Sequence, residues 1–142
     1  MLTNVEKIVH LCMTPFFSSL NHDQLRSIAK ECVTQEFSAH DIVFREGDRG
    51  DLLYIIVSGQ VAIAKGGGVR LATLGPISCF GEMAIFEDAP RSATARAQTD
   101  CRMLTLSRRS VLKIGRSFPQ VYEAFLQTLS ARLRIATEII TD

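Results

Sequence analysis

The chain has 142 residues, of which 46% are hydrophobic and 22% are charged, and its formal net charge is +1. This length suits one ordinary domain, and the apolar share is enough for a hydrophobic core. A net charge this close to zero excludes a polycation that binds nucleic acid or an anionic membrane through bulk charge. The longest apolar run, Leu52–Val57, is far too short to span a bilayer. We therefore expect neither direct nucleic acid binding nor a membrane segment.

The cysteines and histidines argue against a metal centre. The four cysteines lie at positions 12, 32, 79 and 101, outside any Cys-x-x-Cys pair and without a histidine at ligand spacing. The first ten residues contain an early acidic residue and no signal-peptide core. We therefore expect no bound metal, reduced thiols and a cytoplasmic location.

Residues 4–33 have apolar positions at helical spacing. Pro15 interrupts this segment, so we expect two helices rather than one. Asn21 is a good N-cap for the second helix, and Gln24 stands at the reciprocal position of a capping box.

From about residue 34 the apolar period changes to two, which indicates strands. The stretches with this pattern are 33–37, 42–44, 53–57, 60–65, 69–74, 92–97 and 101–106. Glycine and aspartate residues separate them, and the three glycines at 66–68 are typical of a hairpin tip. Short strands at near-regular spacing favour an antiparallel sandwich or barrel.

Residues 107–140 return to a helical pattern, with Pro119 where the first turn of a helix tolerates it. A heptad stripe nearly three repeats long follows, made of Tyr122, Leu126, Leu129, Leu133, Ala136 and Ile140. Two interpretations stay open: an amphipathic helix packed on its own barrel, or one that also pairs with a partner or swings. The Arg108-Arg109 pair before it is more typical of a solvated helix start than of a nucleic-acid patch.

In chain order, these patterns predict one domain over 1–142 of the α+β class, mainly β. The helical segment is 4–33, the barrel is 34–106 and the C-terminal helices are 107–140. We expect an antiparallel β-barrel, or jelly roll, with helices at both ends.

The segment 80–97, FGEMAIFEDAPRSATARA, combines groups that suit a phosphorylated sugar. The Glu82 carboxylate can accept hydrogen bonds from a sugar hydroxyl, and the Arg91 guanidinium can grip a phosphate through its planar fork of donors. Residues 82–86 suit a single helical turn whose free backbone N–H groups form an anion site. Gly81 lets the backbone approach a ligand closely.

Small residues after the arginine complete this segment. Ser92 and Ala93 leave room for a ligand against the following strand. The segment therefore predicts a ligand with one phosphate and one ribose hydroxyl in a single pocket. A glutamate and an arginine nine residues apart would, on their own, favour a solvated salt bridge on a loop, so the prediction depends on the whole segment.

Two separated motifs resemble those of the cyclic nucleotide-binding domain family, which includes regulatory subunits of cAMP-dependent kinase, the bacterial catabolite activator and cyclic nucleotide-gated channels. FGEMAIF…PRSATARA is similar to the phosphate-binding cassette of that family. Upstream, FREGDRGDLLYIIVSGQV is similar to its Gly-Asp…Tyr-x-(Ile/Val)-x-x-Gly hairpin region. The resemblance spans roughly residues 15–140. It implies a domain that binds cAMP or cGMP beneath its C-terminal helix, which acts as the lid.

The resemblance also implies a role for each matching residue. Glu82 is expected to bind the ribose 2′-hydroxyl, and Arg91 to pair with the cyclic phosphate. Ser92 stands where a hydroxyl in relatives can touch the phosphate or a syn purine. The other expected ligand-binding residues are Phe80, Gly81, Met83, Ala84 and Ala93 in the cassette, Val61, Ile63, Leu74 and Cys79 in the apolar wall around the base, and Arg134, with Arg132, on the lid helix.

One position departs from the family pattern. Many members carry a glycine about four residues before the Gly-Glu pair, whereas this chain has Ile77, followed by Ser78 and Cys79. We therefore expect the turn between the strand and the cassette to differ locally.

The function implied by the resemblance is that of a non-enzymatic sensor. It would bind a cyclic nucleotide, with cAMP preferred over cGMP, and convert binding into movement of its C-terminal helix. No cofactor is expected besides this ligand. Through the helix we expect a homodimer or an intramolecular partner.

Alternative functions come from different classes. The chain could be the ligand-binding part of a transcription factor, channel or transporter, or a family fold that has lost nucleotide binding. A transcription factor of the catabolite-activator type needs a helix-turn-helix after the long helix, and the sequence stops at Asp142. An enzyme would need a catalytic set, which we do not find, and the glycines at 66–68 do not continue as a nucleotide-binding loop.

Overall fold

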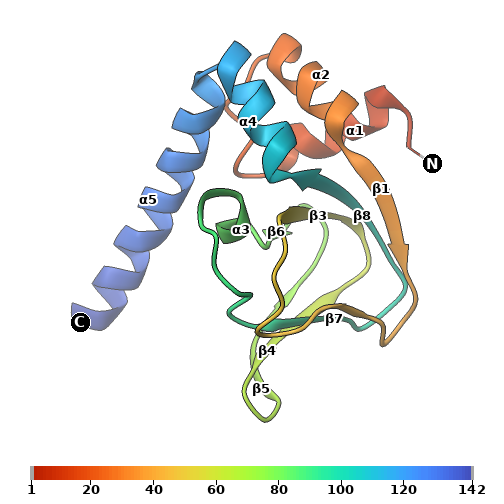
Figure 1. The fold of residues 1–142 in the computed structure, drawn as a ribbon, viewed down its shortest axis with the longest axis vertical. Helices are drawn as coiled ribbons and strands as arrows, with labels where there is room; N and C mark the ends of the chain where they lie inside the picture. The colour runs from red at the N-terminus through yellow and green to blue at the C-terminus, as the bar shows by residue number, and fades with distance from the viewer. Residues whose placement is uncertain (1, 142) are drawn as a thin grey trace.

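Two antiparallel sheets form the centre of the molecule (Figure 1). The structure is a computed structural model that describes residues 2–141 and, of these, the side chains of 2–138. Within that range, one sheet has the order β1-β8-β3-β6 and the other β2-β7-β4-β5, which confirms the predicted jelly roll. The strands are β1 (Val33–Phe37), β2 (Ile42–Phe44), β3 (Leu52–Ser58), β4 (Val61–Lys65), β5 (Val69–Leu74), β6 (Cys79–Phe80), β7 (Thr94–Ala97) and β8 (Cys101–Ser107).

Strand β3 separates two hydrophobic cores. Leu53 and Ile55 belong to the core that the sheet shares with the helices. Tyr54 and Ile56 belong to the second core, between the two sheets. Successive side chains of a strand point to opposite faces, so a strand buried on both faces is apolar at nearly every position. This explains the uninterrupted apolar run in the sequence.

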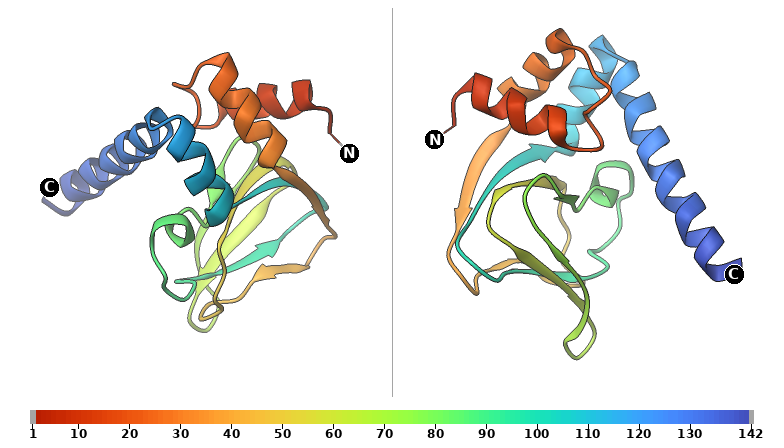
Figure 2. Two further views of the ribbon diagram at one scale, coloured as in Figure 1. Left: turned by 45° about the horizontal axis from the view of Figure 1, so that its top comes forward. Right: turned by 180° about the vertical axis from the view of Figure 1, so that it is seen from behind.

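The N-terminal helices cover the outer face of the first sheet (Figure 2). They are α1 (Asn4–Met13) and α2 (His22–Glu31). The predicted capping box at α2 is formed: the Asn21 side chain accepts from the Gln24 N–H, and the Gln24 side chain accepts from the Asn21 N–H, both at 2.9 Å. Between the helices, the ring of the fully buried Phe16 stacks on Phe125 at 4.7 Å. The two ends of the chain therefore share one core.

Three further helices follow the barrel strands or interrupt them: α3 (Met83–Phe86), α4 (Arg108–Ser117) and α5 (Gln120–Thr141). The first turns of α5 pack on the molecule's own core, where Val121 and Phe125 are buried. Further along, Leu126 and Leu133 of the heptad stripe are exposed, and Figures 1 and 2 show the C-terminal half of α5 projecting beside the barrel. The first turns thus fit the interpretation of a helix packed on its own barrel, whereas pairing with a partner or swinging stays a prediction. The Ile140 side chain lies outside the described residues. No helix in the described range is both long and apolar enough to cross a membrane.

The turn before the cassette explains the departure at position 77. Ile77 has φ +66°, in the left-handed region that glycine occupies without steric cost. Its N–H donates to the Ile56 carbonyl at 3.0 Å, which fixes it beside β3. A β-branched residue there is strained. The backbone therefore has the conformation that suits glycine, although the side chain is that of isoleucine.

We predict that Ile77→Gly raises the free energy of unfolding by about 0.5–1 kcal/mol, because relief of the left-handed strain exceeds the chain entropy that glycine adds. Urea unfolding followed by circular dichroism measures this. Val69, an exposed β-branched residue at the start of β5, is the matched control, and Val69→Gly should lower stability. Equal destabilisation by both substitutions would contradict the argument.

Candidate functional site

A cavity of about 340 Å³ opens beside the cassette, between α3 and the sheet that contains β4 and β7. Ligand pockets in proteins typically have volumes of about 300–1,000 Å³. Nine of the residues expected to contact a ligand line it: Ile63, Phe80, Gly81, Glu82, Met83, Ala84, Arg91, Ser92 and Ala93. Phe44, Glu87, Ala89 and Pro90 also line it and were not predicted.

Backbone hydrogen bonds join the two sequence motifs at this cavity. The Arg91 N–H donates to the Asp48 carbonyl at 2.7 Å, and the Gly47 N–H donates to the Arg91 carbonyl at 2.8 Å. Asp48 in turn accepts from the Arg45 N–H through its side chain at 2.9 Å, which closes the turn. The upstream motif therefore holds the backbone of the cassette arginine in place.

The Arg91 guanidinium is buried in the wall of the cavity, and the residue is only 8% exposed. Nη2 donates to the Leu52 carbonyl at 2.9 Å and Nη1 to the Gly81 carbonyl at 3.3 Å. The Phe44 ring lies 4.2 Å from the guanidinium carbon, a cation–π contact. Nε is buried and has no hydrogen-bond partner. The group is thus a cation held by two carbonyls and a ring, and its Nε lacks an acceptor.

Burial lowers the pKa of Arg91 below its ordinary value, whereas Tyr54 and the carboxylates of Asp51, Asp48 and Glu82 raise it. An arginine stays protonated under such a shift, because its ordinary pKa is far above neutrality. A desolvated cation with a free donor favours an anionic partner. The charge at this wall therefore suits a phosphate.

Glycines make the space for this guanidinium. A Cβ on Gly81, which has φ +77°, would lie 2.9 Å from Arg91 Nη1, and one on Gly50 would lie 2.9 Å from Nη2. Gly81 belongs to the cassette and Gly50 to the upstream motif, so each motif contributes a residue without a side chain to the same cation. The close approach of the guanidinium therefore requires a glycine at both positions.

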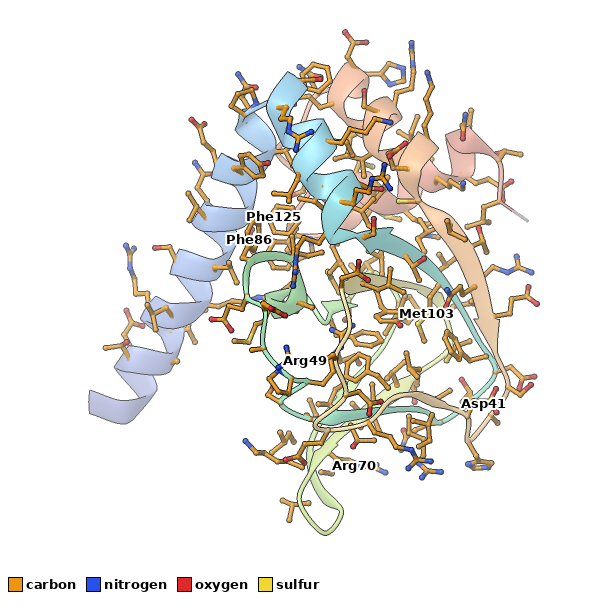
Figure 3. All side chains as sticks on the ribbon, viewed as in Figure 1. Asp41, Arg49, Arg70, Phe86, Met103 and Phe125 are labelled. Atoms are coloured by element: carbon orange, nitrogen blue, oxygen red, sulfur yellow. The ribbon has the colours of Figure 1, made fainter. Side chains whose placement is uncertain are left out.

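Glu82 already has a partner on the C-terminal helix. Its Oε1 accepts from Arg132 Nη1 at 3.0 Å, with the glutamate side chain 18% exposed. The Arg132 guanidinium also lies 4.8 Å from the centre of the Phe16 ring. Figure 3 shows a second contact between the same elements, with Phe86 of α3 beside Phe125 of α5, their ring centres 5.3 Å apart. α5 is therefore in contact with the cassette in this structure.

Four of the residues expected in the site lie elsewhere. Val61 is buried between the sheets, and Leu74 packs against the same core. Cys79 belongs to the core beneath the helices, where burial raises the pKa of its thiol well above the ordinary value. Arg134 is exposed beside Leu126 on another face of α5. The described residues also contain no group of three or more His, Cys, Asp or Glu side chains that could hold a metal ion.

The chain resembles known proteins in both sequence and structure. The family model of the cyclic nucleotide-binding domain matches residues 34–117. The CRP-like cAMP-activated global transcriptional regulator of Mycobacterium tuberculosis is 30% identical over 136 residues, which are 93% of this chain and 61% of the regulator. The chain thus spans about three fifths of this curated relative.

Solved structures agree with this match. The catabolite activator protein of Thermus thermophilus has a TM-score of 0.82 and 31% identity, over 90% of this chain and 62% of that protein. The regulatory domain of Toxoplasma gondii PKA, crystallised with cAMP, has a TM-score of 0.74 and 29% identity, over 78% of this chain and 44% of that protein. Since the family model matches more than half of the residues and these relatives cover most of the chain, the protein belongs to the cyclic nucleotide-binding domain family.

Proposed function

We propose that this chain is a regulatory module that binds a 3′,5′-cyclic nucleotide, with cAMP preferred over cGMP, and that it catalyses no reaction itself. The observation that carries the proposal is the buried Arg91, which lines a cavity of suitable size together with the Glu82 carboxylate. The PKA relative crystallised with cAMP supports a ligand of this class. The regulators named above support a role in control rather than in catalysis.

In the proposed complex, the cyclic phosphate pairs with Arg91, and the ribose 2′-hydroxyl donates to Glu82. Gly81, Met83 and Ala84 would add backbone N–H groups, and the exposed Ser92 hydroxyl would lie next to the phosphate. A guanidinium and a carboxylate on one cavity wall match the two polar groups that a cyclic nucleotide presents on one side.

The apolar part of the cavity is the proposed site of the base. Ile63, Phe80, Ala93 and the newly found Phe44 form this part of the wall. An apolar wall without evident partners for the edge of guanine suits adenine better, which supports the preference for cAMP. Ser92 is compatible with both bases.

Isothermal titration with cAMP, cGMP and 5′-AMP tests the proposed function directly. We expect saturable binding of cAMP, weaker binding of cGMP and little binding of 5′-AMP, whose open phosphate carries a second charge and a different shape. The proposal would be overturned if neither cyclic nucleotide gave a binding heat at concentrations up to about the millimolar range. A dissociation constant in that range corresponds to only a few kcal/mol of binding free energy.

We predict that Arg91→Lys weakens cAMP binding by roughly 10- to 100-fold, because lysine keeps the charge but loses the planar fork, and charge-assisted hydrogen bonds contribute about 1.5–3 kcal/mol. Isothermal titration gives the affinity, and thermal unfolding checks that the variant is folded. Arg49, which pairs with Asp88 at the surface near the cassette, supplies the control Arg49→Gln. Unchanged affinity in folded Arg91→Lys would remove Arg91 from the site.

We also predict that Glu82→Ala abolishes the preference for cAMP over 2′-deoxy-cAMP, which we expect to be about tenfold or more in the unmodified protein because the hydroxyl bonds a charged acceptor. Comparing two ligands on the same variant cancels effects of the lost Arg132 contact. Glu87→Ala, at another carboxylate that lines the cavity, should keep the preference. A preference that survives in Glu82→Ala would place the ribose elsewhere.

We further propose that the ligand changes the pose of α5. Support comes from the shared group: Glu82, the proposed acceptor for ribose, is bound by Arg132 of α5. A ligand shifts such an equilibrium only if it binds one pose more tightly. The exposed Leu126 and Leu133 suit pairing of α5 with a second copy or with another segment of the same protein.

The proposed unit is the whole of 1–142, acting in the cytoplasm. Three of the four free cysteines are buried, which suits a reducing compartment. Whether the unit regulates DNA binding, a channel, a transporter or a kinase depends on the protein to which it is joined.

A further inference from the structure

Arg108, the first residue of α4, reaches the backbone of the cassette helix. Its Nε and Nη2 donate to the Ala84 carbonyl at 2.9 and 2.6 Å, and Nη2 also donates to the Glu87 carbonyl at 2.9 Å. The side chain is half-buried, whereas its neighbour Arg109 is exposed. Arg108 is therefore not a solvated residue at the start of a helix.

The carbonyls that it binds belong to Ala84, within α3, and to Glu87, the C-cap residue of α3. The last four carbonyls of a helix lack partners within the helix, and in a four-residue helix this applies to nearly all of them. A guanidinium satisfies two such acceptors at once, because its donors form a rigid planar fork. A lysine could not bridge both in the same way. This geometry requires an arginine.

The donor is itself held firmly. The Arg108 N–H donates to the Asp51 carbonyl at 2.8 Å, which joins it to the upstream motif. Ser107 caps α4 by accepting from the Ser110 N–H at 3.1 Å. Because the Arg108 backbone is held at the junction of β8 and α4, its guanidinium can hold α3 in position.

We propose that Arg108 is a positioning residue for the nucleotide site: it holds the cassette helix on the first turn of α4 and passes any displacement of α3 to α4. This inference rests on the proposed cyclic nucleotide binding. It does not involve contact between Arg108 and the ligand. The coupling is carried by the three hydrogen bonds to α3.

α4 is in turn joined closely to α5. A Cβ on Gly115 would overlap the ring of Tyr122, so the absence of a side chain there lets the two helices approach. The Tyr122 hydroxyl donates to the Leu112 carbonyl at 3.2 Å. Through Arg108 the cassette is thus linked to α5 by way of α4, a route separate from the direct contact between Glu82 and Arg132.

The test compares Arg108→Gln and Arg108→Lys with the control Arg109→Gln at the exposed neighbour. Titration with cAMP should show about tenfold weaker binding in Arg108→Gln, within the usual range of coupling between sites. The cAMP affinity of Arg108→Lys should lie between those of Arg108→Gln and the unmodified protein. Arg109→Gln should bind cAMP as tightly as the unmodified protein does. Normal cAMP affinity in Arg108→Gln would overturn the positioning role.

A second measurement separates positioning from a general loss of stability. In NMR spectra of the unmodified protein, saturating cAMP should shift amide signals in both α3 and α4. In Arg108→Gln, saturating cAMP should still shift α3 signals, but the shifts at Val111 and Ile114 of α4 should be lost. If those α4 signals move as in the unmodified protein, the coupling does not pass through Arg108.

Hydrogen exchange tests the same contact without any ligand. The Ile85 and Glu87 amides donate within the cassette, to the Glu82 and Met83 carbonyls, and report its opening. They should exchange faster in Arg108→Gln than in Arg109→Gln, while β3 amides remain unchanged. Equal exchange in the two variants would refute the positioning role. If the unmodified protein binds no cyclic nucleotide, the proposed function fails, and this exchange result still decides the role of Arg108.

Discussion

The burial of the Arg91 guanidinium is the constraint around which the site is built. Removing a cation from water is costly unless the protein replaces the lost hydrogen bonds. Here the Leu52 and Gly81 carbonyls and the Phe44 ring replace part of the hydration shell. Nε remains without a partner, so the replacement is incomplete. A phosphate bound in the cavity, as proposed above, would supply the opposite charge.

The same constraint explains why two motifs far apart in the sequence occur together. Gly50 of the upstream motif and Gly81 of the cassette leave the space that the guanidinium fills. Asp48 binds the backbone of Arg91 through its carbonyl. Neither motif alone could place the arginine. The two motifs together form the surroundings of one guanidinium. For this physical reason, the presence of both motifs is stronger support for the predicted site than the presence of either one.

Local patterns predicted most of the fold and most of the polar residues that line the cavity, because turns, capping boxes and the cassette are encoded over a few residues. The apolar residues that line the cavity were harder to predict. Phe80 lines the cavity while Cys79 faces the opposite core, as the two-residue period of a strand requires. Phe44 reaches the cavity from β2, and nothing in its own stretch of sequence marks it, whereas Arg132 of α5 was expected there only from the family resemblance. Strand β6, only two residues long, gave no periodic signal to detect.

Three arginines hold the cassette helix from three directions. Arg91 binds the Gly81 carbonyl before α3, Arg108 binds the Ala84 and Glu87 carbonyls, and Arg132 binds the Glu82 side chain. They come from the cassette itself, from α4 and from α5. A four-residue helix has little stability of its own, so its position is set by these contacts. A ligand that displaced α3, as proposed above, would therefore also change the contacts of Arg108 and Arg132, which belong to the two helices that follow the barrel.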